Sequence, residues 1–311
     1  MAGTTLQRAY VASKFALELD GAGMMGFLNS AEGGGMKTDL AEYKQGALVE
    51  VWRQVGKPKF EDITLKVGMG MSPVFYTWIA DFFKRKITRK NGAIVAADFN
   101  YKERARRTFI DALISEVQIP ALDGSSKDAA FMTIKMVAEG MSFESQTDGP
   151  KIESPPGMRQ PNKLWHAANF RFVVHGFEDA CMRVTKIDQF TIKQQILEYP
   201  SGHQRLPIRV PGRLEYPNIT IYVPRVDADP FIEAANARLL DYDAPAEGGM
   251  NAALEFTGPD KTTLCTINMT GVDVVSAEPQ KLEASAENLY MVKVMIQVET
   301  MFFEYAAEAT V

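Results

Sequence analysis

The chain has 311 residues, of which 46% are hydrophobic and 23% are charged, and its formal net charge is −5. At about 150 residues per domain, this length predicts two domains of similar size. Residues 1–150 carry 19 basic and 18 acidic side chains, and the remainder carries 15 basic and 21 acidic ones. Neither half therefore has the strongly basic character of a domain dedicated to nucleic-acid binding.

The sequence shows few signals for membrane insertion, for secretion or for cysteine chemistry. No apolar run approaches the roughly 20 residues that a membrane-spanning helix needs. The first ten residues, MAGTTLQRAY, lack the basic start and apolar core of a secretory signal, so we expect synthesis in the cytoplasm. The two cysteines, Cys181 and Cys265, lie in apolar or strand-like surroundings rather than in a metal-ligand spacing, which predicts buried free thiols.

The first expected strand, Phe15–Leu19, alternates apolar and polar side chains and ends before a glycine-rich segment. Residues 21–35 contain six glycines, and this composition predicts a mobile loop that can pack against a partner. The apolar side chains of this loop are the first candidate contact residues. They are Met24, Met25, Phe27 and Leu28.

The same segment also allows an enzymatic interpretation. Residues 21–26, GAGMMG, satisfy the GxGxxG pattern of a Rossmann dinucleotide site, and Asp39 stands roughly where a ribose-binding acid would. Such a site needs a helix that begins at the third glycine, whereas Gly33–Gly35 would interrupt that helix. A Rossmann-type dinucleotide-binding enzyme is retained as the alternative from another class, and a monomeric β-barrel ligand carrier is a third.

A β-hairpin is expected next. Leu48–Val55 and Phe60–Val67 both have the alternation of strands, and Gly56–Lys59 between them combines glycine and proline in the manner of a turn. We therefore expect these two strands to pair with each other.

An amphipathic helix follows this hairpin. Ser72 suits an N-cap and Pro73 the first helical turn, after which apolar side chains recur at helical spacing through Phe83. Trp78 lies on the apolar side, so we expect it in the core rather than in a cofactor site.

The most basic run of the chain, Lys84–Lys90, comes directly after the helix. One interpretation is a solvated helix end, where cations face the negative end of the helix dipole. The other is a charged contact with an acidic partner surface, which includes the carboxylates of the second half. The candidate contact residues of this run are Lys84, Arg85 and Lys86.

Three more strands are expected in the first half, at residues 94–101, 108–120 and 131–143. Residues 145–161, SQTDGPKIESPPGMRQP, then contain four prolines and no apolar periodicity, which is typical of a connection between folded units. The expected organisation is a first domain over 1–147, a linker over 148–164 and a second domain over 165–311.

The second half repeats the first. Phe60–Trp78 returns as Tyr216–Ala234 at a shift of 156 residues, which a duplicated domain explains most simply. Three further pairs of segments also match. They are 15–21 with 170–176 and 111–119 with 266–274, both at a shift of 155, and 132–144 with 292–304 at a shift of 160. The sequence therefore predicts two tandem, mainly β domains, each with a flanking helix.

The residue types of common catalytic and metal sites are dispersed. The three histidines show no spacing for metal ligation or a proton relay. The acidic pairs Asp227/Asp229 and Asp241/Asp243 lack the length and glycine pattern of a calcium loop, so we expect solvated carboxylates. The expectation is a protein without enzymatic activity, cofactor or metal.

Three pieces of the first half resemble the tail tube protein family of contractile-tailed phages and phage-tail-like contractile injection systems. They are the opening strand Phe15–Gly21, the segment Gly56–Val67 with the following Tyr76–Trp78, and the closing Glu139–Glu144. The resemblance covers residues 1–145 well and 165–305 weakly, since Ala234 occupies the position equivalent to the tryptophan.

The resemblance implies a small β-barrel or β-sandwich with a flanking helix. Six such domains join edge to edge into a ring with a continuous inner sheet, and the rings stack into a tube. It also implies self-association, partners among tail sheath, baseplate and terminator proteins, and DNA or protein cargo in the lumen. The expected location of the protein is a virion tail or a phage-tail-like particle assembled in a bacterium. The family's long loop, residues 21–43 here, would contact the next ring.

Two tandem domains suggest that one chain fills two of the six positions, so that three chains form a pseudo-hexameric ring. A net charge of +1 in residues 1–150 and −6 in the remainder would favour alternation of the two domains. A baseplate-proximal or terminal tube component is the alternative within the same class, and six chains per ring would place the second domain outside the inner wall.

Overall fold

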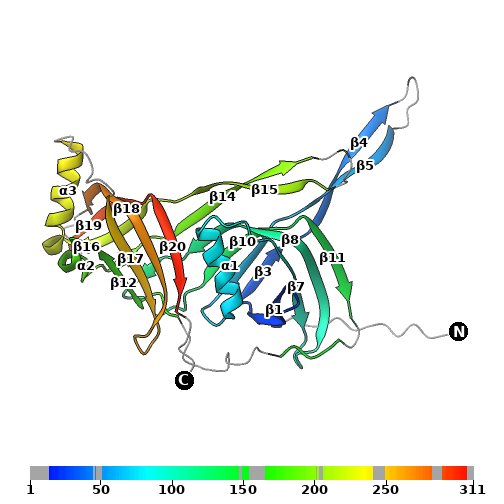
Figure 1. Ribbon diagram of the computed structural model, residues 1–311, viewed down its shortest axis with the longest axis horizontal. Coiled ribbons are helices and arrows are strands. Elements are labelled where there is room, and N and C mark those ends of the chain that lie inside the picture. The colour runs from blue at the N-terminus through cyan, green and yellow to red at the C-terminus, as the bar shows by residue number, and fades with distance from the viewer. Residues whose placement is uncertain are drawn as a thin grey trace.

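The computed structural model describes residues 14–44, 46, 51–146, 149–153, 165–200, 202, 206–240, 249–281 and 289–306. These residues are mainly β, with a few helices, and they form two large antiparallel sheets that lie side by side in an elongated molecule (Figure 1). Below, the first half means the described residues of 14–146 and the second half those of 165–306.

The first sheet has the order β2-β1-β7-β8-β10-β6-β3, and β11 also pairs with β8. The long strand β8 bends, so its first part pairs with β7 and β11 and its last part pairs with β10. The bounds are β1 (Lys14–Leu19), β2 (Met24–Phe27), β3 (Ser30–Gly33), β6 (Ile63–Val67), β7 (Lys90–Ala97), β8 (Glu103–Ile119), β10 (Met132–Val137) and β11 (Gly140–Ser145).

The second sheet has the order β12-β17-β18-β19-β16-β13-β9, with β20 on β18, and from β12 to β13 it repeats the order β1-β7-β8-β10-β6-β3 of the first, with no counterpart of β2 among the described strands. The tandem β fold expected from the sequence is therefore present. The bounds are β9 (Leu122–Asp123), β12 (Phe170–Val174), β13 (Lys186–Ile187), β16 (Ile219–Pro224), β17 (Met250–Thr257), β18 (Thr263–Pro279), β19 (Met291–Gln297) and β20 (Thr300–Tyr305), with α2 (Glu178–Cys181), η1 (Arg225–Asp227) and α3 (Asp229–Leu239) among them.

The register of the strands corrects one of the sequence alignments between the two halves. Val117 lies opposite Ile134, and Ala277 lies opposite Val294, so β18 corresponds to β8 at a shift of 160 residues. The expected match of 111–119 with 266–274, at a shift of 155, is therefore wrong. Asp111 and Gly271, which are also 160 residues apart, both have positive φ (52° and 62°). A residue of this kind interrupts the alternation of a strand, and the alignment relied on that alternation.

The glycine-rich segment is not the loop that the sequence suggested. Strands β2 and β3 occupy most of it, and Gly26 lies within β2 rather than at the start of a helix. Every described strand pair is antiparallel, unlike the parallel core of a Rossmann fold. The dinucleotide interpretation of residues 21–26 is therefore wrong.

The expected hairpin is also corrected. Strand β5 (Val51–Phe60) runs straight through the glycine and proline and pairs with β4 (Met36–Lys44), while β6 pairs with β10 and β3. The strands approach so closely that a Cβ at Gly56 would stand 2.8 Å from the carbonyl oxygen of Asp39. Pro58 lies opposite Thr38, where the register of the pair shifts. Both residues mark an irregular strand rather than a turn.

Helix α1 (Pro73–Phe83) has the extent that the sequence predicted. Ser72 precedes it but does not cap it, because its hydroxyl lies 3.0 Å from the sulfur of Met25. Trp78 is 2% exposed and donates its indole N–H to the carbonyl of Thr88 at 3.0 Å, which confirms its place in the core.

Replacing Trp78 by alanine is expected to destabilise the protein by about 3–5 kcal/mol, because a large buried aromatic leaves a cavity and an unpaired carbonyl. Val74 on the same helix is 42% exposed, so Val74→Ala should shift the unfolding transition much less. Guanidinium unfolding followed by circular dichroism measures both variants. Similar midpoints for the two would contradict this assignment of the core.

Candidate assembly interface

Strand pairing joins the two halves. The hairpin of β14 (Phe190–Tyr199) and β15 (Ile208–Glu215) leaves the second half and crosses the first (Figure 1). Phe190 lies opposite Ile119 and Lys193 opposite Glu116, so β14 extends the first sheet beyond the last part of β8. Strand β9 (Leu122–Asp123) of the first half pairs in turn with β13 of the second. Each sheet thus contains strands from both halves.

Helix α1 forms a second contact between the halves, against β20. The Tyr76 ring stacks on Tyr305 with 4.1 Å between ring centroids, and the ring centroids of Phe83 and Phe303 are 5.8 Å apart. The Tyr76 hydroxyl donates to the carbonyl of Gly68 at 2.9 Å, and burial raises the pKa of this phenol well above its usual value. Stacked rings with a satisfied hydroxyl make a specific apolar contact.

A half-buried ion pair anchors the β14–β15 hairpin near its tip, where Arg209 lies opposite Glu198. Glu139, in the turn between β10 and β11, forms an ion pair with Arg89 and accepts the backbone N–H of Arg209 at 2.9 Å. Arg89 also donates to the carbonyl of Arg209 at 2.6 Å. The side chains of Arg89 and Glu139 are 29% and 20% exposed, so these charge-assisted bonds are only partly screened.

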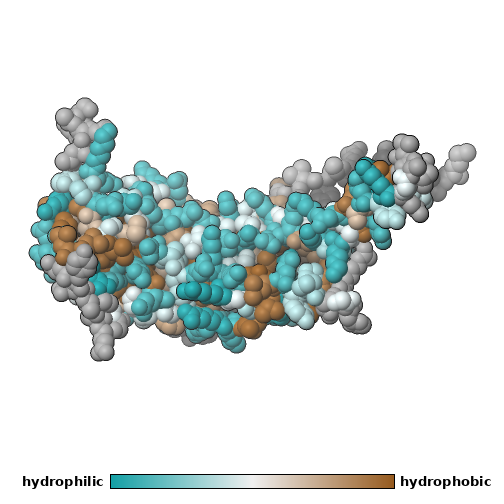
Figure 2. All heavy atoms as spheres, turned by 90° about the horizontal axis from the view of Figure 1, so that it is seen from above, coloured by the Kyte–Doolittle hydropathy of each residue, from teal (hydrophilic) through white to brown (hydrophobic). Residues whose placement is uncertain are grey.

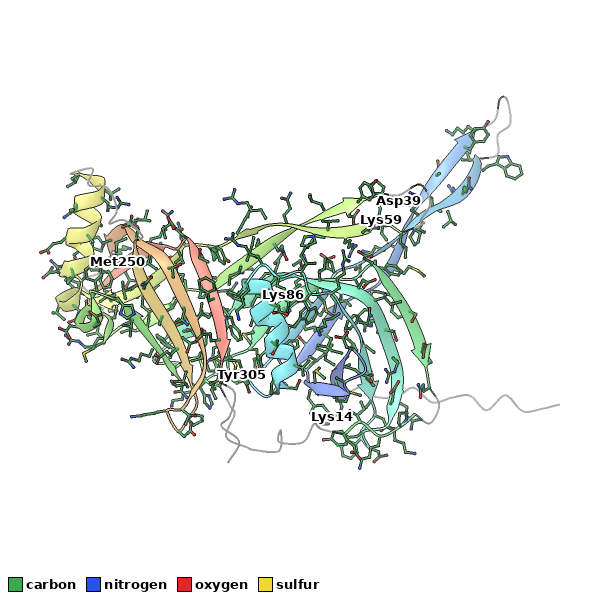
Figure 3. The ribbon with its side chains drawn as sticks, viewed as in Figure 1. Lys14, Asp39, Lys59, Lys86, Met250 and Tyr305 are labelled. Atoms are coloured by element: carbon green, nitrogen blue, oxygen red, sulfur yellow. The ribbon has the colours of Figure 1, made fainter. Side chains whose placement is uncertain are left out.

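The hairpin extends as far as the base of β4–β5. Asp39 and Lys59 pair across that base at 2.7 Å, and Figure 3 shows them beside the far end of β14–β15. The hydrogen bond from Lys59 to Asp39 raises the pKa of the lysine, and Glu198 on β14 adds to the same effect. The second half therefore reaches across the whole upper side of the first.

The glycine-rich candidate residues divide by burial. Met25 and Leu28 are 2% and 7% exposed and belong to the core of the chain, so their side chains are not available to a partner. Phe27 is 38% exposed and meets the edge of Tyr101 at 5.9 Å, while Met24 is half-buried. The sequence did not reveal this division because glycines obscured the alternation of β2.

The basic candidates Lys84, Arg85 and Lys86 are exposed beyond the end of α1. Lys86 pairs with Asp81 at 3.2 Å. The Arg85 guanidinium lies 5.7 Å from the centre of the Tyr216 ring, so this cation contacts the second half through an aromatic face rather than a carboxylate.

Sequence reasoning missed the two long hairpins, although a signal for them exists. In β4–β5, Arg53 lies opposite Glu42, and in β14–β15, Arg209 lies opposite Glu198. Both pairs follow the 156-residue repeat, which makes the hairpins equivalent.

All of β4 is exposed. The large apolar side chains exposed on β4–β5 are Met36, Leu40, Tyr43, Val51, Trp52 and Val55.

Neither a cluster of metal ligands nor a membrane-spanning helix occurs in the part of the chain that the structure describes. It holds no group of three histidine, cysteine or acidic side chains that could bind an ion. Asp227 and Asp229 pair with Arg183 and Arg225, and the other acidic pair lies outside the described residues. Its longest helices have 11 residues, too few to span a bilayer.

Comparison with known proteins finds a family match within the first half. Residues 11–142 match the family model described as T4-like virus tail tube protein gp19. The first half is therefore similar to the tail tube proteins of this family. This match ends before the second half, which resembles the first half in strand order and repeat register. No curated protein matches the chain.

Solved structures similar to this chain come from contractile injection systems. One is a chain of an extracellular system's PVC sheath–tube complex in the extended state, with 19% identity over 45% of this chain and 95% of that chain, at a TM-score of 0.39. Another belongs to the tube-terminating cap of the anti-feeding prophage, with 20% identity over 47% and 100% of the two chains, at 0.39. A third, from the PVC sheath/tube terminator, has 19% identity over 45% and 99%, at 0.38.

The cysteines provide a test of the contact between the halves. Cys265 is fully buried, its sulfur lies 4.0 Å from that of Met69 in the first half, and burial raises its pKa. Burial raises the pKa of Cys181 to about 11. Since only the thiolate reacts, both should resist Ellman's reagent at pH 8 and react fully in denaturant. Rapid labelling of Cys265 in native protein would contradict the packed contact.

Removing the Glu139 carboxylate should loosen the β14–β15 hairpin. Glu139→Ala takes away the acceptor for Arg89 and for the Arg209 N–H, a loss of about 1–3 kcal/mol. Hydrogen exchange in β15 should accelerate about 10-fold to 100-fold, while exchange in β17 stays unchanged. Glu32→Ala, at an exposed position on β3, is the matched control and should leave β15 unaffected. Equal exchange in both variants would contradict the anchor.

Proposed function

We propose that this chain is a structural protein of an inner tail tube, in which rings stack into a conduit. The match of residues 11–142 to the tail tube family supports this class. The observation that carries the proposal is the pairing of β14 with β8, because a strand from one half completes the sheet of the other. A tube wall needs this kind of pairing at every junction, since unpaired sheet edges otherwise face solvent.

The chain contributes two positions to each ring in this proposal. Its two tandem domains span 1–147 and 165–311, joined by the linker at 148–164, and three chains make a pseudo-hexameric ring. The support is the shared strand order of the two sheets together with the contact between them. The excess of carboxylates in the second half would favour alternation with the first.

The proposed partners follow from this role. Copies of the chain itself form the ring and the stack, a tail sheath surrounds it, and a baseplate or terminator protein ends it. The lumen passes DNA or protein cargo. Synthesis takes place in a bacterial cytoplasm and assembly in a virion tail or phage-tail-like particle. A terminal or baseplate-proximal place in the tube is the alternative within this class.

Native mass spectrometry of the purified assembly, with electron microscopy of the same sample, tests the proposal. We expect rings or tubes and a repeating mass of three chains. Six chains per ring would move the second half out of the inner wall. Monomers at high concentration would contradict the structural role and favour a ligand carrier.

A further inference from the structure

We propose that the β4–β5 hairpin of one chain binds across the second half of a second copy of this chain, with β4 pairing along the last residues of β18. The inference rests on the proposed ring and adds the surface, the register and the direction of the contact between chains. The pairing of β14 with β8 within one chain is the model for this contact between chains.

The two hairpins are equivalent but differ in what they rest on. Leu40 lies opposite Val55, and Ile196 lies opposite Pro211, which again fits the 156-residue shift. Yet β14 pairs with β8, whereas β4 and β5 form a separate two-stranded sheet among the described residues. Leu40 is 59% exposed, whereas its equivalent Ile196 on β14 is half-buried.

The second half offers the matching strand edge. Residues 276–279 of β18 correspond to residues 116–119 of β8, which lie between β10 and β14. Among the described strands, this part of β18 pairs with β19 alone. Its other edge therefore presents backbone groups at the place where β14 lies on the first half.

An open groove lies where the hairpin would rest. On the first half, Lys59, Phe60 and Glu139 line a gap of only about 20 Å³, and Glu198 and Arg209 of the β14–β15 hairpin close its other side. The equivalent residues of the second half, Glu215, Tyr216 and Glu299, line a groove of about 920 Å³. The same surface is thus filled on the first half and empty on the second.

Charged groups in the open groove suit the incoming hairpin. Glu299 is equivalent to Glu139, which accepts the backbone N–H of Arg209, and Arg209 is equivalent to Arg53 on β5. Glu299 is exposed and lines the groove, so it is placed to accept the N–H of Arg53 from the next chain.

The helix contact also has an unfilled counterpart. Phe83 of α1 packs near Phe303 of β20, and the equivalent residues are Leu239 of α3 and Phe143 of β11. Leu239 is 56% exposed and Phe143 is 54% exposed in the single chain. Packing Leu239 of one chain against Phe143 of the next would bury both side chains. The junction between chains would then have a strand pairing and a helix contact, as the junction between the two halves of one chain does.

These surfaces lie at opposite ends of the molecule. Figure 1 shows α3 with β18 and β19 at one end, and β11 with the β4–β5 hairpin at the other. Figure 2 shows apolar surface toward both ends. Complementary surfaces at opposite ends make a head-to-tail contact, which closes into a ring when the rotation allows.

Engineered disulfides test the register. Lys37 and Ser276 correspond to Lys193 and Glu116, which lie opposite each other, so the variant with Lys37→Cys and Ser276→Cys should link neighbouring chains. The control variant, Thr191→Cys with Gln118→Cys, joins positions that face each other within one chain. Both native cysteines are buried.

After oxidation of the assembled protein, denaturing electrophoresis should show covalent dimers and trimers for the first variant and only monomers for the control. Three-chain rings without cross-links would overturn this junction and leave the tube function standing. Protein that forms no rings at all would overturn both.

Glu299→Ala supplies an independent measurement. Loss of its bond to the next chain should raise the concentration at which rings dissociate by about tenfold or more, without changing the circular dichroism of the chain. Glu32→Ala is again the control and should leave ring dissociation unchanged. Equal dissociation of the Glu299→Ala and wild-type rings would count against the groove as the hairpin's binding surface.

Discussion

The backbone of β8 needs partners on both sides, and this requirement connects every large feature of the chain. Along its first part β7 and β11 supply them, and along its last part β10 and the incoming β14 do. An unpaired edge at this position would be a template for aggregation. The second half removes that edge, and the α1 contact and the Glu139 anchor hold the pairing strand in place.

Divergence between the halves concentrates where their surroundings differ. Phe82 and Leu113 line one small gap in the first half, and their equivalents in the second are Arg238 and Asp273, which form an ion pair with Nε at 2.6 Å from the carboxylate. Helix α1 buries six side chains, including large aromatic ones, whereas α3 buries two. Helix α1 lies between two sheets and α3 at the end of the molecule, so a more polar α3 suits a surface that stays in water until assembly.

Much of the fold followed from the sequence because repetition and periodicity are local signals. The α1 helix, the buried Trp78 and the tandem β architecture were all predicted and found. The sequence does not predict the hairpins, because Gly56 and Pro58 are residue types typical of a turn although they lie within β5. Pairing of β14 with β8 depends on backbone groups that side-chain patterns do not report, so no residue type could have indicated it. The burial of Met25 and Leu28 was hidden by the glycines around them.

Cryo-electron microscopy of assembled particles, reconstructed without imposed symmetry, tests the central claim most directly. The account predicts six lobes of two alternating kinds in each ring, with residues 190–193 beside residues 116–119 of the same chain. Six identical lobes, with the second half outside the inner wall, would contradict it.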